Sequence, residues 1–247
     1  MKFNIDTFEL ENRICRVYRG AGNGSDISCV IVQAVDKEWI VRAGAQGEAA
    51  VGTVQADTLG AEAESILQAR RNDIIFANFA VEHWNDELSP WSADAVFKNQ
   101  PFAGRAESTL NFVTDIFIPE LISRYSLPSD IKIVIGGYSL AGLFALWASY
   151  MTDIFHAVAA VSPSVWFPGW IESATEKHVL ADKVYLSLGN REEKTNNRTM
   201  ARVGDNIRLQ KELLDRQGVQ SVLEWNEGNH FRDVEERTAR GFRWTIL

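Results

Sequence analysis

The sequence contains little cysteine. Cys15 and Cys29 are its two cysteines, too few for the disulfide framework that holds small secreted domains together. Neither belongs to a Cys-x-x-Cys pair or to a cluster with histidine, so we expect no metal site. Nothing else in the sequence calls for a cofactor, and we expect none. Both cysteines are predicted to be buried apolar residues.

Basic residues are also scarce. The chain has 25 Lys and Arg against 33 Asp and Glu, a formal net charge of −8, and it has no Lys- or Arg-rich run. Binding to nucleic acid depends on a positive surface that neutralises phosphates, so nucleic acid is not an expected partner. A small polar or neutral ligand fits this composition better.

The sequence also offers no clear leader or membrane segment. Asp6 and Glu9 interrupt residues 1–10, so no secretory apolar core is present and the cytoplasm is the expected compartment. Residues 133–152 carry no charge and would be long enough to cross a bilayer as a helix. Gly136 and Gly137 interrupt this run and β-branched residues begin it, so we interpret it as a strand followed by a helix.

The 247 residues are 46% hydrophobic, enough for a sizeable core. No linker composition or internal repeat divides them, so we expect one domain over residues 1–247. Strand patterns occur at residues 3–8, 14–18, 28–35, 74–80, 131–135, 157–161, 183–188 and 222–225. Helix patterns occur at residues 58–71, 106–125 with a kink at Pro119, 140–151, 198–217 and 233–246.

This alternation predicts the α/β class, with a mostly parallel central sheet covered by helices on both faces. The first two strands form an antiparallel pair at the sheet edge, and residues 28–35 are expected to be a central strand buried on both faces. Residues 36–55 show little periodicity and are expected to be irregular or weakly β.

One strand-to-helix junction carries the sharpest chemical signal. The β-branched run at residues 131–135 reaches Gly136 and Gly137, and the composition becomes helical immediately after Ser139. This is the pattern of a nucleophile elbow, whose turn is so tight that small residues must flank the serine. Gly137 stands two residues before Ser139, and Ala141 replaces the usual glycine two residues after it. The alternative is an ordinary glycine-rich turn.

A serine nucleophile needs a base, and the four histidines are His83, His156, His178 and His230. His230 is the best candidate, because it lies in a short polar loop between the last predicted strand and the last helix. The others are expected to be surface residues without a catalytic role, and the same alternative exists for His230.

The residue that orients the base should follow a strand between the serine and the histidine. The strand at residues 183–188 leads into such a loop, where Glu192 lies three residues after Gly189. Glu192 is the preferred acid, and its neighbour Glu193 is the main rival. A solvated acidic loop is the third interpretation.

These segments together resemble a known family. The run Gly-Gly-Tyr-Ser-Leu-Ala-Gly at residues 136–142, Ser-Pro-Ser-Val-Trp at residues 162–166, the Gly-x-x-Glu loop and Gly-Asn-His-Phe at residues 228–231 are similar to the putative esterase (esterase D-like) family of α/β-hydrolases. That family includes enterochelin esterases, feruloyl esterases and mycolyltransferases. The resemblance implies an α/β-hydrolase fold from about residue 28 onward, with Ser139 as nucleophile, His230 as base and Glu192 as acid.

In such a fold the oxyanion hole takes one backbone N–H from the residue after the serine, Leu140, and another from residues 34–37. We expect Trp166 and Trp84 to line the substrate pocket, although Trp84 and Trp91 could equally be core residues. Ser162 and Ser164 are rival serines, but Pro163 between them favours a loop without an elbow.

We therefore expect a serine esterase that acts on a small-molecule ester through an acyl-enzyme and a Ser139–His230–Glu192 triad. An acyltransferase would use the same chemistry with an alcohol in place of water, and a non-catalytic ligand-binding protein could share the fold. The sequence leaves the acyl group, the alcohol and the oligomeric state open.

Overall fold

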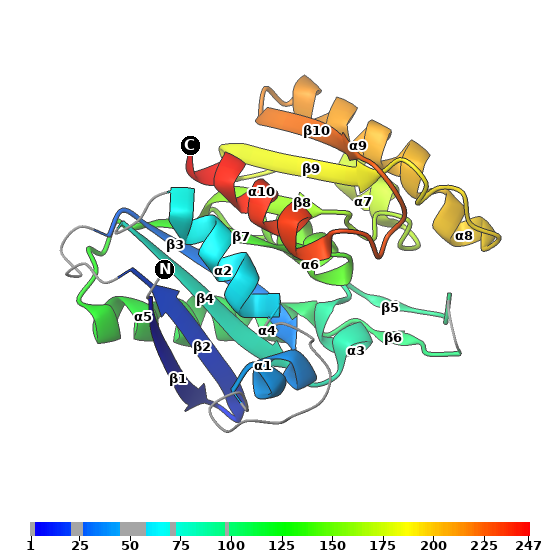
Figure 1. The fold of residues 1–247 in the computed structure, drawn as a ribbon. Coiled ribbons are helices and arrows are strands. Elements are labelled where there is room, and N and C mark those ends of the chain that lie inside the picture. Colours follow the sequence, from blue (N-terminus) through cyan, green and yellow to red (C-terminus); the bar gives the residue numbers. More distant parts are fainter. Residues whose placement is uncertain (1–2, 21–26, 45–57, 70–72, 97–98) are drawn as a thin grey trace.

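A central sheet of eight strands organises the molecule (Figure 1). The computed structural model describes residues 3–20, 27–44, 58–69, 73–96 and 99–247. The strand order is β1-β2-β4-β3-β7-β8-β9-β10. The strands are β1 (Asn4–Leu10), β2 (Arg13–Arg19), β3 (Cys29–Asp36), β4 (Ile74–Val81), β7 (Lys132–Tyr138), β8 (Phe155–Val161), β9 (Lys183–Gly189) and β10 (Gln220–Asn226).

Strand directions follow the sequence prediction. The pair β1 and β2 is antiparallel at one edge, β2 runs antiparallel to β4, and the six strands from β4 to β10 are parallel. Every residue of β4 is buried, which explains its continuous apolar sequence. The predicted edge pair and the mostly parallel sheet are confirmed.

Helices cover both faces of the sheet (Figure 1). Each face of the sheet carries its own apolar core, one larger than the other, and successive residues of β3 point to opposite faces. Val30 and Val32 face the larger core, and Ile31 and Val35 face the smaller one. The smaller core lies under α1 (Lys37–Gly44), α2 (Thr58–Ala69) and α10 (Val234–Ile246). The larger core lies under α4 (Ala106–Phe112), a π-helical turn (Val113–Phe117), α5 (Ile118–Tyr125), α6 (Leu140–Ala148), α7 (Trp170–Thr175) and α9 (Val203–Arg216).

The prediction for residues 36–55 was wrong where the structure describes them. Strand β3 extends through Asp36, and α1 follows directly. The Asp36 carboxylate accepts a hydrogen bond from the Glu38 backbone N–H at 2.8 Å, which caps the helix. A helix this short shows too few periodic positions to be recognised from sequence. Residues 45–55 lie outside the described part of the chain.

Two predicted helices are interrupted. The helix at residues 106–125 widens into the π-helical turn just before Pro119, where the Ile118 N–H bonds to the Val113 carbonyl. Proline clashes with the carbonyl four residues earlier in a regular helix, so the irregular turn precedes it. The helix predicted at residues 198–217 divides at Arg202 into α8 (Arg198–Ala201) and α9. Short elements missed by sequence are α3 (Trp84–Leu88), α7 and the hairpin of β5 (Ser92–Ala93) with β6 (Phe102–Ala103).

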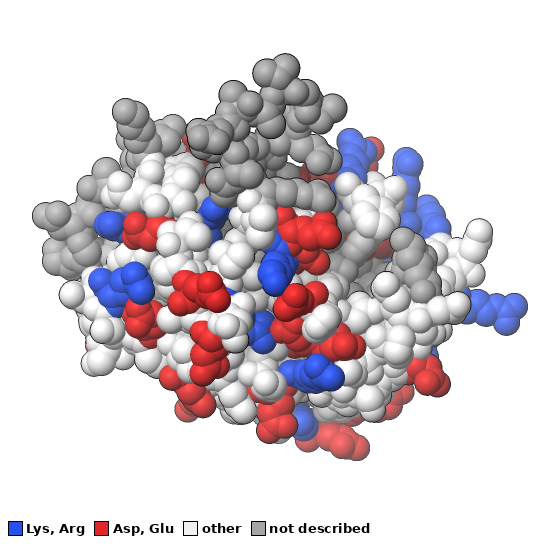
Figure 2. All heavy atoms as spheres, turned by 90° about the horizontal axis from the view of Figure 1, so that it is seen from below, with Lys and Arg blue, Asp and Glu red and all other residues white. Residues whose placement is uncertain are grey.

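The uncharged run at residues 133–152 falls into strand β7 and helix α6, as predicted. Across the described residues, no helix combines the length and the apolar character needed to span a membrane. Figure 2 shows acidic and basic side chains interspersed on the face it draws.

Candidate active site

Ser139 occupies a strained turn between β7 and α6. Its backbone angles are φ 59° and ψ −120°, outside the regions that non-glycine residues favour. A Cβ atom on Gly137 would lie 2.7 Å from the Cβ of Ala141, so the turn requires glycine two residues before the serine. The methyl group of Ala141 fits because Gly137 has no side chain opposite it. This geometry places Ser139 at the carboxyl end of the sheet.

Three residues far apart in the sequence form a continuous chain of hydrogen bonds. The Ser139 Oγ lies 3.0 Å from His230 Nε2, and His230 Nδ1 lies 2.7 Å from Glu192 Oε2. Ser139 follows β7, Glu192 follows β9 and His230 follows β10. Because these strands are parallel, their following loops meet at one edge of the sheet, which brings the three side chains together.

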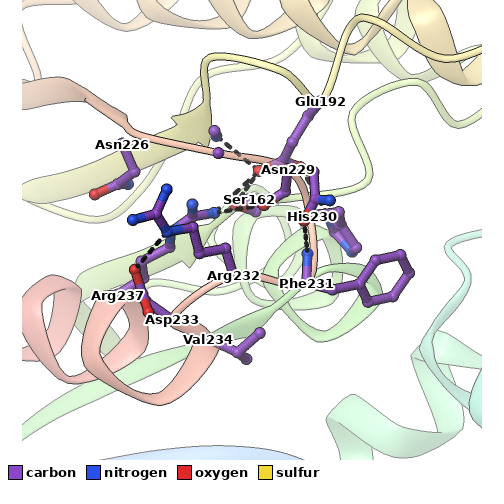
Figure 3. A network of polar contacts seen from close by, with 12 residues as sticks. Ser162, Glu192, Asn226, Asn229, His230, Phe231, Arg232, Asp233, Val234 and Arg237 are labelled. Atoms are coloured by element: carbon purple, nitrogen blue, oxygen red, sulfur yellow. Dashed lines mark hydrogen bonds and ion pairs between the residues drawn. The ribbon is translucent and has the colours of Figure 1, made fainter.

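The Glu192 carboxylate is held from several directions (Figure 3). Its Oε1 accepts hydrogen bonds from the Gly189 backbone N–H at 2.7 Å and from Ser162 Oγ at 2.8 Å. The side chain is 4% exposed. Glu193 instead pairs with Arg208 at 3.2 Å and is 33% exposed. Of the two adjacent acids, the structure therefore turns Glu192 toward His230 and Glu193 away from it.

Sequence analysis missed Arg237, which contacts both Glu192 and the loop that carries His230. The Arg237 guanidinium, 2% exposed, lies 3.5 Å from Glu192 Oε1 and donates to the backbone carbonyls of Asn229 at 3.1 Å and Glu227 at 2.6 Å (Figure 3). It also donates to Tyr138 Oη at 3.3 Å. Arg237 lies on α10 and reads in the sequence as one of several basic residues of an amphipathic helix, so no local pattern distinguishes it.

Sequence analysis also missed Tyr138, the last residue of β7, because no local pattern shows what its hydroxyl contacts. Its hydroxyl donates to the His230 backbone carbonyl at 2.7 Å, and its ring lies 5.1 Å from the imidazole. Burial, together with the negative charge of Glu192, raises the pKa of the Tyr138 hydroxyl, so it stays protonated and acts as a donor. Tyr138 and Arg237 together fix the backbone around His230.

Comparison with known proteins identifies the family. The model of the family described as "Putative esterase" matches residues 65–236, more than half of the chain. The chain belongs to this esterase family. It is therefore an esterase.

Solved structures of low sequence identity share the fold. An IroE-like serine hydrolase from Shewanella oneidensis is 15% identical with a TM-score of 0.75, over 98% of this chain and 79% of that one. The siderophore hydrolase EstA from Aspergillus nidulans is 15% identical with a TM-score of 0.64, over 98% and 93%. The enterobactin esterase FES from Shigella flexneri is 14% identical with a TM-score of 0.65, over 99% of this chain and 59% of that one. Comparison with curated protein sequences gives no match.

Two cavities of the esterase meet at Ser139. The first has a volume of about 310 Å³ and is lined by Trp84, Tyr138, the end of β3 and the start of α10. The second has a volume of about 420 Å³ and is lined by Trp166 and the loop after β9. Ser139, His230 and Phe231 line both. The Phe231 ring is 84% exposed and points away from the polar network (Figure 3). The two tryptophans predicted for the pocket thus line different cavities.

Trp91 has a structural position in the esterase. Its indole N–H donates to the Pro168 carbonyl at 2.9 Å, and its ring packs on Phe167 with centroids 5.7 Å apart. Neither cavity at Ser139 includes it among the lining residues. Of the two interpretations of Trp91, the structure favours the packing role.

The other serines and histidines have different neighbours. Ser164 Oγ lies 3.4 Å from Ser139 Oγ, and its backbone N–H donates to the Ser139 carbonyl at 3.1 Å. Ser162 donates to Glu192, as described above. His156, on β8, lies 3.0 Å from the Asp182 carboxylate. His83 immediately precedes α3, and His178 is exposed.

The backbone near Ser139 offers two candidate sources of N–H donors to an oxyanion. Leu140 begins α6, where the first N–H groups of a helix have no partner within the helix. The pairing of β3 with β7 ends at Gln33 and Gly136, whereas its pairing with β4 continues to Asp36. Residues 34–36 therefore pass beside the first cavity without a strand on their β7 side.

Proposed function

We propose that this esterase hydrolyses carboxylic esters through an acyl-enzyme formed on Ser139, with His230 as general base and Glu192 as the acid that orients it. The observation that carries the proposal is the unbroken hydrogen-bond chain from Ser139 Oγ through both ring nitrogens of His230 to Glu192. The strained turn that exposes Ser139 at the sheet edge supports it.

In the first half of the reaction, His230 Nε2 removes the proton of Ser139 as its Oγ attacks the ester carbonyl carbon. The negative charge of Glu192 stabilises the imidazolium that forms and keeps Nδ1 protonated. The tetrahedral intermediate then collapses, and His230 gives its proton to the departing alcohol. Water takes the place of the alcohol in the second half and releases the acid.

The oxyanion of the intermediate needs donors that are already in position. We assign one donor to the Leu140 backbone N–H at the start of α6 and the other to the backbone of residues 34–36. Residues 34–36 line the first cavity beside Ser139, and Leu140 follows Ser139 directly at the start of α6. The cavities on either side of Ser139 would take the acyl and alcohol parts of the ester.

Covalent labelling tests this function. A fluorophosphonate should add to Ser139, and mass spectrometry of peptides should locate the adduct there. Ser139→Ala should lower kcat for 4-nitrophenyl acetate by about 10³-fold or more while the protein stays folded by circular dichroism.

Ser164→Ala is the matched control, because Ser164 Oγ is the other serine hydroxyl near the reacting position. It should keep the label on Ser139 and most of the activity. An adduct on Ser162 or Ser164 in the parent protein would overturn the assignment of Ser139.

A further inference from the structure

Two buried polar side chains lie inside the smaller apolar core. Gln33 projects from the same face of β3 as Ile31 and Val35, and it is 6% exposed. Glu62 lies on α2 among the core residues Leu59 and Ala63 and is 4% exposed. Apolar residues at both positions would continue the core.

These side chains present oxygen atoms that lack partners. Gln33 Oε1 and Glu62 Oε1 are buried, and neither has a hydrogen-bond partner in the described part of the chain. An unpaired buried acceptor costs folding free energy, so such groups in a native protein call for an explanation. A hydrogen-bond donor bound beside the Glu62 carboxyl would offset part of this cost.

The two residues line the same cavity as Ser139 and His230. The acidic side chains in that lining are Asp36, Glu62 and Glu235, and no lysine or arginine of the described residues contributes to it. The second cavity differs, because the charged residues that line it are Arg191, Lys194 and Glu192, so its basic residues outnumber its acidic one among the described residues. The electrostatic character of the site therefore changes sign across Ser139.

The ionised form of Glu62 is unfavourable in these surroundings. Burial, and next the negative charge of Glu235, raise the pKa of Glu62 well above its ordinary value, while the Gln33 amide opposes this shift. Burial thus favours the neutral acid over the carboxylate. A cation beside it would favour the ionised form.

We propose that this first cavity is a subsite for a primary ammonium group on the substrate, whose N–H bonds are accepted by the side chains of Glu62 and Gln33. The inference rests on the proposed function, because the bound group must belong to an ester whose carbonyl reaches Ser139. It assigns a substrate class: esters with a primary amine on the part that enters this cavity. The remaining part of the ester then lies in the second cavity, beyond Phe231.

Matched pairs of esters test the proposal. On the acyl side, 4-nitrophenyl esters of straight-chain acids with a terminal ammonium, six to eight carbons long, are compared with esters whose chain ends in methyl. On the alcohol side, 6-aminohexyl acetate is compared with heptyl acetate. In one series or both, kcat/KM for the ammonium ester should exceed that of its methyl counterpart by about tenfold, as expected for a charged hydrogen bond.

Variants locate the preference. Glu62→Gln should reduce the ammonium-to-methyl ratio of kcat/KM about tenfold. Glu64→Gln is the control, because Glu64 lies on the same helix, accepts a hydrogen bond from Gln68 and does not line the cavity. It should keep the parent ratio. The proposal is overturned if no ammonium ester is preferred in either series, or if Glu62→Gln and Glu64→Gln have the same ratio.

A binding measurement separates this proposal from the proposed function. Hexylammonium and 1-hexanol are titrated into the Ser139→Ala variant by calorimetry, with and without Glu62→Gln. Tighter binding of hexylammonium that is lost with Glu62 would support the subsite even if the parent protein hydrolyses no ester. Equal binding of both compounds would count against the subsite even if the parent protein is an active esterase.

Discussion

Replacing the carboxylate of Glu192 with an amide should nearly abolish ester hydrolysis. In Glu192→Gln, the Gly189 backbone N–H and Arg237 both donate toward the position of Oε1, so the amide oxygen must remain there. The amide NH2 then occupies the position of Oε2, 2.7 Å from His230 Nδ1 in the parent protein. Two donors cannot face each other, so Nδ1 loses its proton.

The proton then moves to Nε2, the nitrogen that should accept the proton of Ser139. The imidazole is held in the wrong tautomer, and the charge that would stabilise the imidazolium is absent. We expect kcat to fall by about 10⁴-fold, the scale seen when the triad aspartate of a serine protease is changed to asparagine. KM should change little, because the Glu192 side chain is only 4% exposed and the substitution keeps its size.

Glu193→Gln is the matched control. It removes an exposed pair with Arg208, which contributes less than about 1 kcal/mol to stability. Its kcat should stay within about twofold of the parent value. Steady-state hydrolysis of 4-nitrophenyl acetate measures both variants, and circular dichroism checks that they fold. A crippled Glu193→Gln, or a loss of only a few-fold in Glu192→Gln, would refute the assignment of Glu192 as the acid.

Three further perturbations address residues around this site. Arg237→Met should lower kcat more than it raises KM, because the His230 loop loses the donor to the Asn229 and Glu227 carbonyls. Recovery of part of kcat in Arg237→Lys would separate loop positioning from packing. Equal losses in the two variants would argue against the role of the charge. Tyr138→Phe removes the bond to the His230 carbonyl and the acceptor of one Arg237 bond, but it leaves Arg237 bonded to the loop carbonyls, so kcat should drop less than in Arg237→Met; an equal drop would contradict this ranking. For Glu62, the raised pKa means that the folded protein binds the proton more tightly than the unfolded chain, so stability falls as pH rises from the ordinary carboxyl value of 4.5. The Tm advantage of Glu62→Gln over the parent should therefore grow with pH in thermal melts, and a constant difference would show that the carboxyl does not titrate in this way.

Local sequence carried much of the fold and the first element of the site. The β-branched run, the two glycines and the abrupt helical composition after Ser139 describe a turn whose geometry depends on adjacent residues. The alternation of strands and helices likewise indicated a parallel sheet, and the chain order of its loops directed attention to Glu192 and His230. The direction of the sheet converts that order into proximity, because all parallel strands end at one edge.

Other features follow from contacts between distant segments, which no local pattern encodes. Arg237 reaches Tyr138 across 99 residues and Glu192 across 45, and its helix shows only an ordinary amphipathic pattern. The choice between Glu192 and Glu193 was open in the sequence, because either carboxylate fits the loop. The hydrogen bond from Gly189 and the approach of the β10 loop decide which one turns inward.

The sequence by itself determined where a strand must turn sharply into a helix and which residue types stand after each strand, because these depend on neighbouring residues and on periodicity. Only the tertiary structure decided that Gln33 and Glu62 lie together beside Ser139. The strand and the helix that carry them are separated by α1 and by residues outside the described part of the chain, and they meet because both pack on the same face of the sheet. A buried polar residue is recognised as unpaired only when its surroundings are known, since burial and hydrogen bonding are properties of the packed chain.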